Sequence, residues 1–243
     1  MKHYHFGEIS STNDYIGHLL QIEDEVVVTA EFQTKGRGRN EKNWFGEYRS
    51  NLYYSYGRKH KDEVNYEELV SYQFVGCLAV LELLEEIAPN VAFRLKYPND
   101  VYAKTPNGWK KISGVLVEHS FSGERCDSSI IGIGINVNQR EFPIAEGINP
   151  TSLSLLGIDT EPEKLIEPLS NNIKKYLSFS SDVIFEKWSG KLTVFDKIII
   201  VSNKSGLWLA TKLFPNGQLE LQSIDTGEKI IVDNSDSVRY ELD

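Results

Sequence analysis

One long amphipathic segment, Tyr66 to Ala88, limits the folds open to this chain more than any other feature. Its apolar residues recur every three or four positions and mark one helical face: Leu69, Val70, Phe74, Leu78, Leu81 and Leu84. Pro89 ends the helix because proline cannot continue it. Strand-like segments lie on both sides: Val26 to Phe32, Asn51 to Tyr56, Ala92 to Lys96, Lys111 to His119 and Ser129 to Val137. This arrangement predicts an α+β fold, with helices packed on a mixed or antiparallel central sheet.

The pattern changes near Leu192. Before it, Thr151 to Leu156 and Glu163 to Trp188 have helical periodicity. After it, short strands alternate with turns such as Pro215-Asn216-Gly217 and Asp225-Thr226-Gly227, about ten residues apart, which is typical of a small β-barrel. We therefore expect two domains, residues 1–192 and 193–243, with the boundary between positions 190 and 196.

The charge balance narrows the possible partners. With 26 Lys and Arg against 35 Asp and Glu, the formal net charge is −9, which disfavours nucleic acid. Cys77 and Cys126 occur in no CxxC or Cys/His spacing, so we expect two reduced thiols and no metal ligands. The sequence contains no run of 18 apolar residues and no apolar leader core. These features predict a cytoplasmic protein without a membrane partner.

The densest chemical signal is the segment Gly36-Arg37-Gly38-Arg39, followed by Lys42 and Trp44. Glycines let a backbone approach a ligand closely, and two arginines offer bidentate forks to phosphate or carboxylate. Trp44 offers a ring that can stack on a purine. Taken alone, the segment fits a solvated basic surface loop equally well, and it is not a Walker A loop.

A second segment, Lys96-Tyr97-Pro98-Asn99-Asp100, precedes a strand that opens at Lys111 and contains Gly114. The turn presents an amide and a carboxylate together, and the Lys111 ammonium can meet a phosphate. Gly114 leaves room for a ligand against the strand. Taken alone, an ordinary hairpin with exposed lysines is the simpler interpretation.

Two weaker segments complete the set. Gly132-Ile133-Gly134-Ile135-Asn136-Val137-Asn138 places its glycines inside a strand, which argues against a dinucleotide-binding fold. Such glycines mark close approach of a ligand or of backbone, and Asn136 can contact a nucleotide; a β-bulge with a satisfied amide is the alternative. Ser11-Thr12-Asn13, taken alone, is a helix N-cap.

The order and spacing of these segments resemble the biotin protein ligase family over roughly Phe6 to Asn138. The resemblance implies a catalytic fold like that of class II aminoacyl-tRNA synthetases, followed by a C-terminal SH3-like barrel. It implies an enzyme that uses ATP and Mg²⁺ to form biotinyl-5'-AMP from biotin. The enzyme then transfers biotin to a lysine of a biotin carboxyl carrier protein domain. A homodimer is compatible with the resemblance.

The resemblance also implies a role for each matched position. The residues around biotin are Ser11, Thr12, Asn13, Gln33, Gly36, Arg37 and Gly114. The residues around ATP and the adenylate are Arg39, Lys42, Trp44, Asn99, Lys111 and Asn136. The catalytic residues are Lys111, Arg37, Arg39 and Asp100, with Arg37 and Lys111 neutralising two anions and Asp100 orienting or deprotonating the acceptor lysine.

The sequence departs from the family pattern at several points. Tyr97 stands where tryptophan is usual, Lys42 stands where arginine is common, and the loop 40–43 is less basic than is usual. No helix-turn-helix segment precedes Phe6, so we expect the monofunctional form that does not bind DNA. Two alternatives remain: a lipoate-type acyl-adenylate ligase, against which the Gly-Arg-Gly-Arg loop argues, and a non-catalytic binding module.

Overall fold

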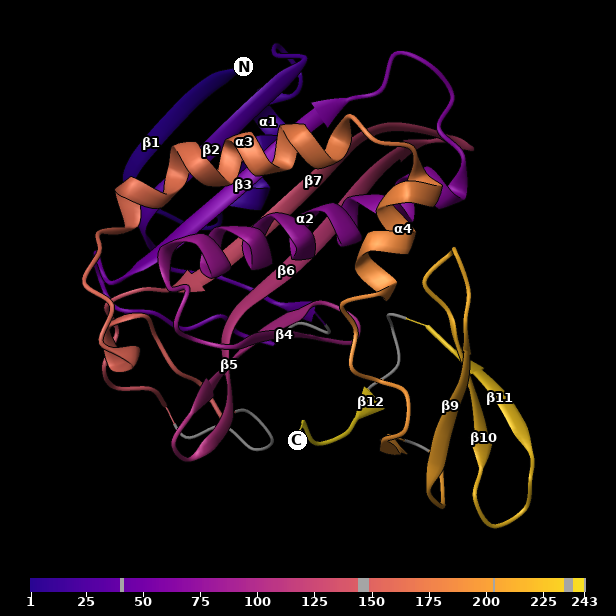
Figure 1. Cartoon of the computed structure of the whole chain (residues 1–243). Helices are drawn as coiled ribbons and strands as arrows, with labels where there is room; N and C mark the ends of the chain where they lie inside the picture. The colour runs from indigo at the N-terminus through magenta and orange to yellow at the C-terminus, as the bar shows by residue number, and fades with distance from the viewer. Residues whose placement is uncertain (40–41, 144–148, 203, 234–237, 243) are drawn as a thin grey trace.

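The computed structural model describes residues 1–39, 42–143, 149–202, 204–233 and 238–242 (Figure 1). The larger sheet and its first two helices are built from β1 (Lys2–Ile9), α1 (Thr12–Leu19), β2 (Glu25–Gln33), β3 (Asn51–Lys59), α2 (Tyr66–Ile87), β4 (Phe93–Lys96), β5 (Asp100–Thr105), β6 (Gly108–Ser122) and β7 (Arg125–Asn136). Next come two 3₁₀ turns (Ser154–Leu156 and Pro162–Leu165), α3 (Ile166–Leu177) and α4 (Ser181–Ser189). The chain ends with β8 (Ile198–Val201), β9 (Trp208–Leu213), β10 (Leu219–Ser223), β11 (Lys229–Val232) and β12 (Val238–Arg239).

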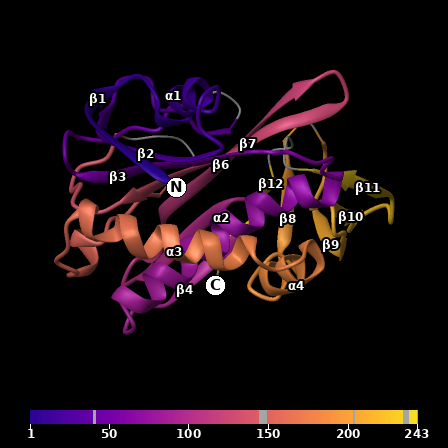
Figure 2. The ribbon, with the colours of Figure 1, turned by 90° about the horizontal axis from the view of Figure 1, so that it is seen from above.

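The larger sheet is seven-stranded, in the order β1-β2-β3-β7-β6-β5-β4. Strands β1 and β2 pair in parallel and the other neighbours pair antiparallel, so the sheet is mixed. Helices α2, α3 and α4 cover one face, and α1 lies on the other (Figures 1 and 2). The prediction of an α+β fold with helices on a mixed central sheet is confirmed.

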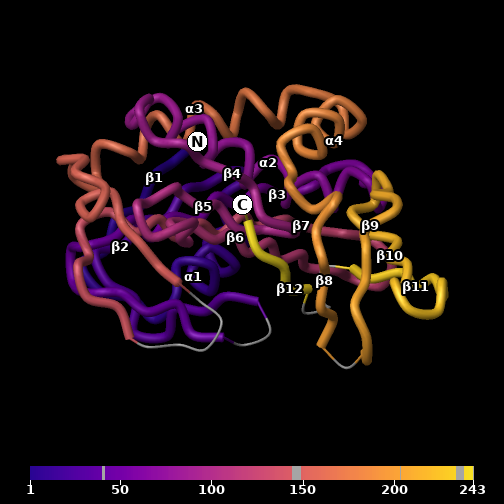
Figure 3. The backbone as a smooth tube through the Cα atoms, turned by 60° about the horizontal axis from the view of Figure 1, so that its bottom comes forward, coloured from indigo at the N-terminus to yellow at the C-terminus, as the bar shows by residue number. Residues whose placement is uncertain are grey.

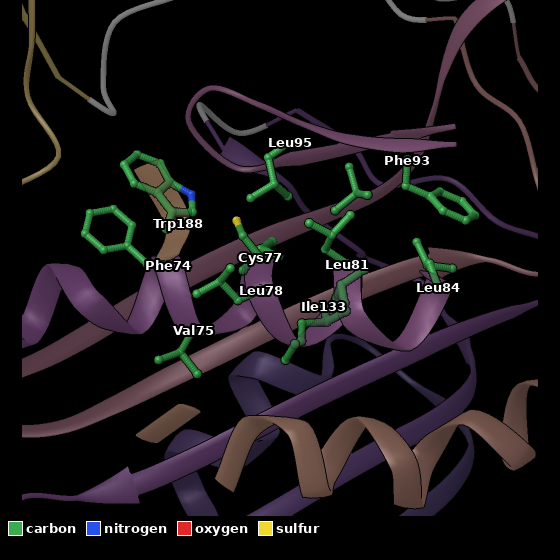
Figure 4. Packing of buried hydrophobic residues seen from close by; sticks show 14 of the residues in the cluster. Phe74, Val75, Cys77, Leu78, Leu81, Leu84, Phe93, Leu95, Ile133 and Trp188 are labelled. Carbon is green, nitrogen blue, oxygen red and sulfur yellow. The ribbon is translucent and has the colours of Figure 1, made fainter. Parts of the chain in front are cut away.

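Helix α2 forms because its N-terminus and its apolar face are both satisfied. The side chains of Asn65 and Glu68 each accept a hydrogen bond from the other's backbone N–H, at 2.9 and 3.0 Å, which is a capping box. The buried face of the helix packs on β4 and β7 and on Trp188, whose ring stacks on Phe74 at 4.0 Å between centroids (Figure 4). At Gly76 a Cβ would lie 2.6 Å from Val115, so glycine is what lets α2 approach the sheet this closely.

Helix α1 packs on the opposite face through a separate, smaller apolar cluster. Ile16 is fully buried there against Val26 and Val28 of β2 and Ile130 of β7. Ser11 is the N-cap residue as predicted, but its side chain makes no capping hydrogen bond. The hydroxyl of Ser11 is therefore left to point toward its tertiary neighbours.

Two helix predictions are wrong in extent. In the segment Thr151 to Leu156, only Ser154–Leu156 is helical, as a single 3₁₀ turn. The segment Glu163 to Trp188 is a 3₁₀ turn followed by two helices, α3 and α4, which are separated by Ser178, Phe179 and Ser180. Serine side chains compete with helical backbone hydrogen bonds, and the Ser178 hydroxyl donates to the Lys175 carbonyl at 2.7 Å. Ser180, the N-cap residue of α4, has an extended backbone and makes no side-chain capping bond.

The C-terminal strands form a second antiparallel sheet, in the order β11-β10-β9-β8-β12. Figures 1 and 3 show β12 and the C-terminus beside β4 and β5. Tyr97 joins the two parts: its backbone N–H donates to the Tyr240 hydroxyl at 2.7 Å, and its own hydroxyl donates to the Gly217 carbonyl at 3.0 Å. The domain boundary stays a prediction, since one continuous core includes residues of both sheets. Within the described residues, no helix has the length and apolar character to cross a bilayer.

Candidate active site

A cavity of about 490 Å³ lies on the α1 side of the larger sheet. It is enclosed by the start of α1, the loop after β2, the β4–β5 turn, strands β6 and β7, and β12. Thirteen of the fourteen predicted site residues line it: Ser11, Thr12, Asn13, Gln33, Arg37, Arg39, Lys42, Trp44, Asn99, Asp100, Lys111, Gly114 and Asn136. The predicted residues thus meet around one space, although the first and last of them, Ser11 and Asn136, are about half the chain apart.

Gly36 is the one predicted residue that is not among the described residues lining the cavity. It lies directly behind the lining, where its carbonyl accepts a hydrogen bond from the Trp44 N–H at 2.9 Å. A Cβ at this position would approach the Trp44 carbonyl to 2.8 Å. Gly36 therefore permits the close turn of the loop that contains Arg37, Arg39 and Trp44.

Glycines form the floor of the cavity. Gly114 of β6 and Gly134 of β7 are direct cross-strand partners, and the Trp44 ring lies against both. A Cβ on Gly132 would come within 2.3 Å of Asn13 Oδ1. The absence of side chains on these strands leaves room for α1, for the loop and for the cavity itself.

One end of the cavity holds a network of neutral hydrogen-bonding groups. Gln33 Oε1 accepts bonds from both the backbone N–H and the hydroxyl of Thr12, at 2.7 and 3.0 Å. Ser55 Oγ lies 2.7 Å from Thr12 Oγ1 and 2.5 Å from Asn13 Oδ1. Asn13 Nδ2 donates to Glu118 Oε2 at 2.6 Å. We call this group of Thr12, Asn13, Gln33 and Ser55 the neutral end.

Arg37 lies beside the neutral end, and its charge is balanced within the protein. Its guanidinium lies 2.6 Å from Asp14 and 2.8 Å from Glu118, and it also reaches Ser11 Oγ at 3.4 Å. Two carboxylates therefore face this single cation before any ligand enters. The role of Arg37 in neutralising a ligand anion stays a prediction, and in this structure the side chain braces Ser11 and the strand that contains Glu118.

The other end of the cavity is cationic. Lys111 Nζ lies 2.6 Å from Asp100 Oδ1 and 5.5 Å from the centroid of the Trp44 ring. Arg39 donates to Asn99 Oδ1 at 3.0 Å, and Asn99 donates in turn to the Val115 carbonyl at 2.7 Å. Arg39, Lys96 and Lys111 line this region together, and Asp100 is the one acidic side chain among the described lining residues. We call this region the cationic end.

Burial makes the charged forms at the cationic end costly. It lowers the pKa of the Arg39 guanidinium, which nevertheless stays protonated at neutral pH. Burial also lowers the pKa of the Lys96 ammonium, an effect that the Asp100 carboxylate opposes and the Lys111 charge reinforces. Partly desolvated cations of this kind gain most when an anion joins them, so this end is suited to phosphate or carboxylate.

Backbone pairing places Lys111 and Asn136. The Lys111 N–H donates to the Asn149 carbonyl at 2.7 Å, and the Lys111 carbonyl accepts from Thr151 N–H at 2.8 Å. Asn136 Nδ2 donates to the Thr151 carbonyl at 3.0 Å. The choice of Lys111 over its neighbour agrees with this placement, since Lys110 is not among the described residues that line the cavity.

Several lining or supporting residues were missed by sequence reasoning. Lys96 lies inside a quoted motif and Glu118 inside the predicted strand Lys111 to His119, but neither received a role. Ser55 carried no signal, because strand alternation does not tell which face adjoins a cavity. Val238 and Arg239 reach the lining from β12, a strand of two residues that is too short to show any periodicity.

Fold and cavity together define an α+β protein with a cavity of small-molecule size that has one neutral and one cationic end. The model of the biotin/lipoate A/B protein ligase family matches residues 6–136, more than half of the chain. The chain therefore belongs to this family.

Individual relatives are consistent with that membership. The bifunctional ligase/repressor BirA of Bacillus subtilis is 30% identical over 158 residues, which is 63% of this chain and 46% of the relative. The biotin–[acetyl-CoA-carboxylase] ligase of Mycobacterium tuberculosis is 31% identical over 140 residues, which is 56% of this chain and 46% of the relative. The chain thus matches just under half the length of these curated relatives.

Among solved structures, the chain is similar to the biotin protein ligase from Aquifex aeolicus in complex with biotin and ATP. The TM-score is 0.77 at 28% identity, and the match covers 99% of both chains. The likeness includes the second, C-terminal antiparallel sheet.

Proposed function

We propose that this chain is a biotin protein ligase, which activates biotin with ATP and transfers it to a lysine of a carrier protein. The observation that carries the proposal is the division of one cavity into a neutral and a cationic end. A ureido ring needs neutral donors and acceptors, such as those of Thr12, Asn13 and Gln33. A carboxylate that meets a triphosphate needs cations, which Lys111, Lys96 and Arg39 supply.

In the first step, a carboxylate oxygen of biotin attacks the α-phosphorus of ATP. The bond from that phosphorus to the bridging oxygen breaks, and pyrophosphate leaves with the electron pair. Charge accumulates on the phosphoryl oxygens during this displacement, and the ammonium of Lys111 is the group positioned to stabilise it. Lys111 would exchange its contact with Asp100 for one with the phosphate.

In the second step, the ε-amine of the acceptor lysine attacks the acyl carbon of biotinyl-AMP. An amide forms, AMP leaves, and the lysine nitrogen loses a proton. Asp100 is our candidate to orient that amine or take its proton, because it lines the cavity beside Lys111. Release of Lys111 toward the phosphate would free the carboxylate for this role.

The mixed anhydride must be kept from water between the two steps. The Trp44 ring lies over the glycine floor and its Nε1 is buried, so this segment shields the point where the anhydride would lie. Residues 40 and 41 of the same loop lie outside the described residues. Lys42 lines the cavity from the exposed edge of the loop.

Magnesium enters this proposal only as the counter-ion of ATP. Among the described lining residues the one carboxylate is Asp100, which is paired with Lys111, so the cavity does not fit a resident magnesium ion. The acceptor we propose is a biotin carboxyl carrier domain. We place the activity in the cytoplasm, where free thiols such as Cys77 and Cys126 persist.

The direct test is ATP–pyrophosphate exchange with purified protein. We expect exchange to depend on biotin and to be absent with lipoate or octanoate. Exchange driven by lipoate instead would favour the acyl-ligase alternative. Absence of exchange with every acid, together with absence of ligand heat in calorimetry, would reject the enzymatic proposal.

A further inference from the structure

The end of the larger sheet formed by β4, β5 and β6 differs in charge from the rest of the chain. Residues 93–111 contain five basic residues and one acidic residue: Arg94, Lys96, Lys104, Lys110, Lys111 and Asp100. Their local charge is +4, against a total of −9, so the remaining residues together carry −13. This segment is therefore a basic island on an acidic protein.

Strand register places part of the island on the same face as the cavity. Arg94 is opposite Tyr102, Tyr102 is opposite Lys111, and Lys104 is opposite Trp109. Directly opposed residues in an antiparallel pair project to the same side of the sheet. Tyr102 and Lys111 line the cavity. Their face continues outward to Arg94, Lys104 and Trp109, which we call the basic face.

The two cations of the basic face are held over one aromatic ring. The Arg94 guanidinium carbon lies 4.7 Å from the Trp109 ring centroid, and Lys104 Nζ lies 5.2 Å from it. Lys104 is exposed, and Arg94 and Trp109 are half-buried. Stacking on the indole limits the freedom of both side chains while their charges stay accessible to a partner.

We propose that the basic face is a docking surface for the acceptor protein, which presents an acidic patch beside its target lysine. The proposal rests on the proposed function, since a transfer enzyme must bring a protein-borne lysine to the cavity. A partner seated on the basic face lies on the same sheet surface as Lys111 and Asp100. Complementary charge steers such encounters and fixes their orientation.

An acidic protein fits this surface better than a nucleic acid does. The two cations of the basic face make a small basic footprint, and the charge of −13 on the residues outside 93–111 repels a long polyanion. A compact domain with a local acidic patch can contact the basic island without lying against the net acidic rest of this protein. The basic face also adjoins the cavity in which the proposed reaction modifies a lysine. That reaction needs a protein partner and not a nucleic acid.

The test compares the double variant R94E/K104E with K174E/K187E. The control reverses two exposed lysines on α3 and α4, across the sheet from the cavity, and makes the same change in net charge. The probe is a purified biotin carboxyl carrier domain of acetyl-CoA carboxylase, and its binding is measured by fluorescence anisotropy between 50 and about 300 mM salt. Carrier binding needs no catalysis, so this measurement tests the docking proposal even if the protein forms no adenylate.

We expect R94E/K104E to weaken carrier binding about tenfold at low salt and to lose most of the salt dependence. The KM for the carrier should rise in parallel, while biotin-dependent ATP–pyrophosphate exchange stays within about twofold of the wild-type rate. K174E/K187E should leave carrier binding unchanged. The milder R94Q/K104Q should show the same loss to a smaller degree, which separates charge from misfolding.

Equal carrier binding by the wild type and R94E/K104E would overturn the proposal. So would an equal loss in K174E/K187E, because total charge would then be responsible. Binding of a fluorescent single-stranded oligonucleotide that only R94E/K104E abolishes, with carrier binding unaffected, would assign the face to nucleic acid instead. A wild type without exchange activity would reject the ligase function separately from any of these results.

Discussion

The two ends of the cavity are held in different ways. At the neutral end, Thr12, Asn13, Gln33 and Ser55 bond to one another, so their geometry is fixed before a ligand arrives. At the cationic end, Lys111 pairs with Asp100, Arg39 donates to Asn99, and burial lowers the pKa of the Arg39 guanidinium. The neutral end is thus organised for recognition and the cationic end for charge that develops during reaction.

The largest effect should come from Lys111→Ala. Without the ammonium, the charge that develops on the phosphoryl oxygens loses its main positioned cation, and we expect exchange to fall about 10²–10³-fold. Biotin affinity, measured by calorimetry, should change little, because the neutral end is intact. Lys110→Ala is the matched control and should keep near wild-type exchange. If Lys111→Ala exchanges pyrophosphate at the wild-type rate, the cationic end is not the part of the cavity that stabilises the developing charge.

Gly132→Ala should produce the opposite pattern to Lys111→Ala: biotin affinity should fall, and exchange at saturating biotin should be kept. Its new Cβ would lie 2.3 Å from Asn13 Oδ1, so the neutral end must shift to accept it. We expect biotin to bind about 30-fold more weakly, a cost of about 2 kcal/mol. At saturating biotin, exchange should recover. Gly17→Ala, with open space around the added methyl group, should leave affinity unchanged. If Gly132→Ala binds biotin as tightly as the wild type, Asn13 does not contribute to binding.

Sequence predicted the residues that line the cavity better than it predicted the extent of some helices around it. The residues that line the cavity were predicted through the resemblance of the motifs' order and spacing to one family, because each motif taken alone also fits an ordinary loop, hairpin, bulge or N-cap. The length of α2 was predicted because its apolar period is long and is ended by Pro89. The break at residues 178–180 was missed because the apolar pattern continues through it, whereas the Ser178 hydroxyl donates to the Lys175 carbonyl and the backbone of Ser180 is extended.

Other parts of the site depend on contacts that only the fold creates. Ser55 looks like any small strand residue, and it matters because α1 places Thr12 and Asn13 above it. Arg239 reaches the cavity because the chain returns from the second sheet past Tyr97. Such long-range placements leave no local pattern in the sequence.

Arg39→Gly tests whether the cationic end also retains the adenylate between the two steps. The substitution removes the bond to Asn99 and one of the cations around the adenylate. We expect adenylate synthesis to persist and the intermediate to dissociate about tenfold faster, since bonds to charged groups contribute about 1.5–3 kcal/mol. Streptavidin blots of added bystander proteins would show the escape. Clean blots alongside normal synthesis would argue against retention by Arg39.

The smallest effect tests the neutral end by itself. Ser55→Ala keeps the shape of the strand but removes the hydroxyl that contacts both Thr12 and Asn13. Losing one buried hydrogen-bonding group costs about 1 kcal/mol, so we expect a roughly fivefold weaker biotin affinity and an unchanged exchange rate at saturation.

Ser170→Ala is the matched control, because Ser170 is also buried and hydrogen-bonded but packs on the helix-covered side against Tyr54. Both variants should lose similar stability in urea, whereas only Ser55→Ala should lose affinity. If the two variants lose affinity equally, binding follows overall stability, and the neutral end is not a recognition site fixed in advance by its own hydrogen bonds.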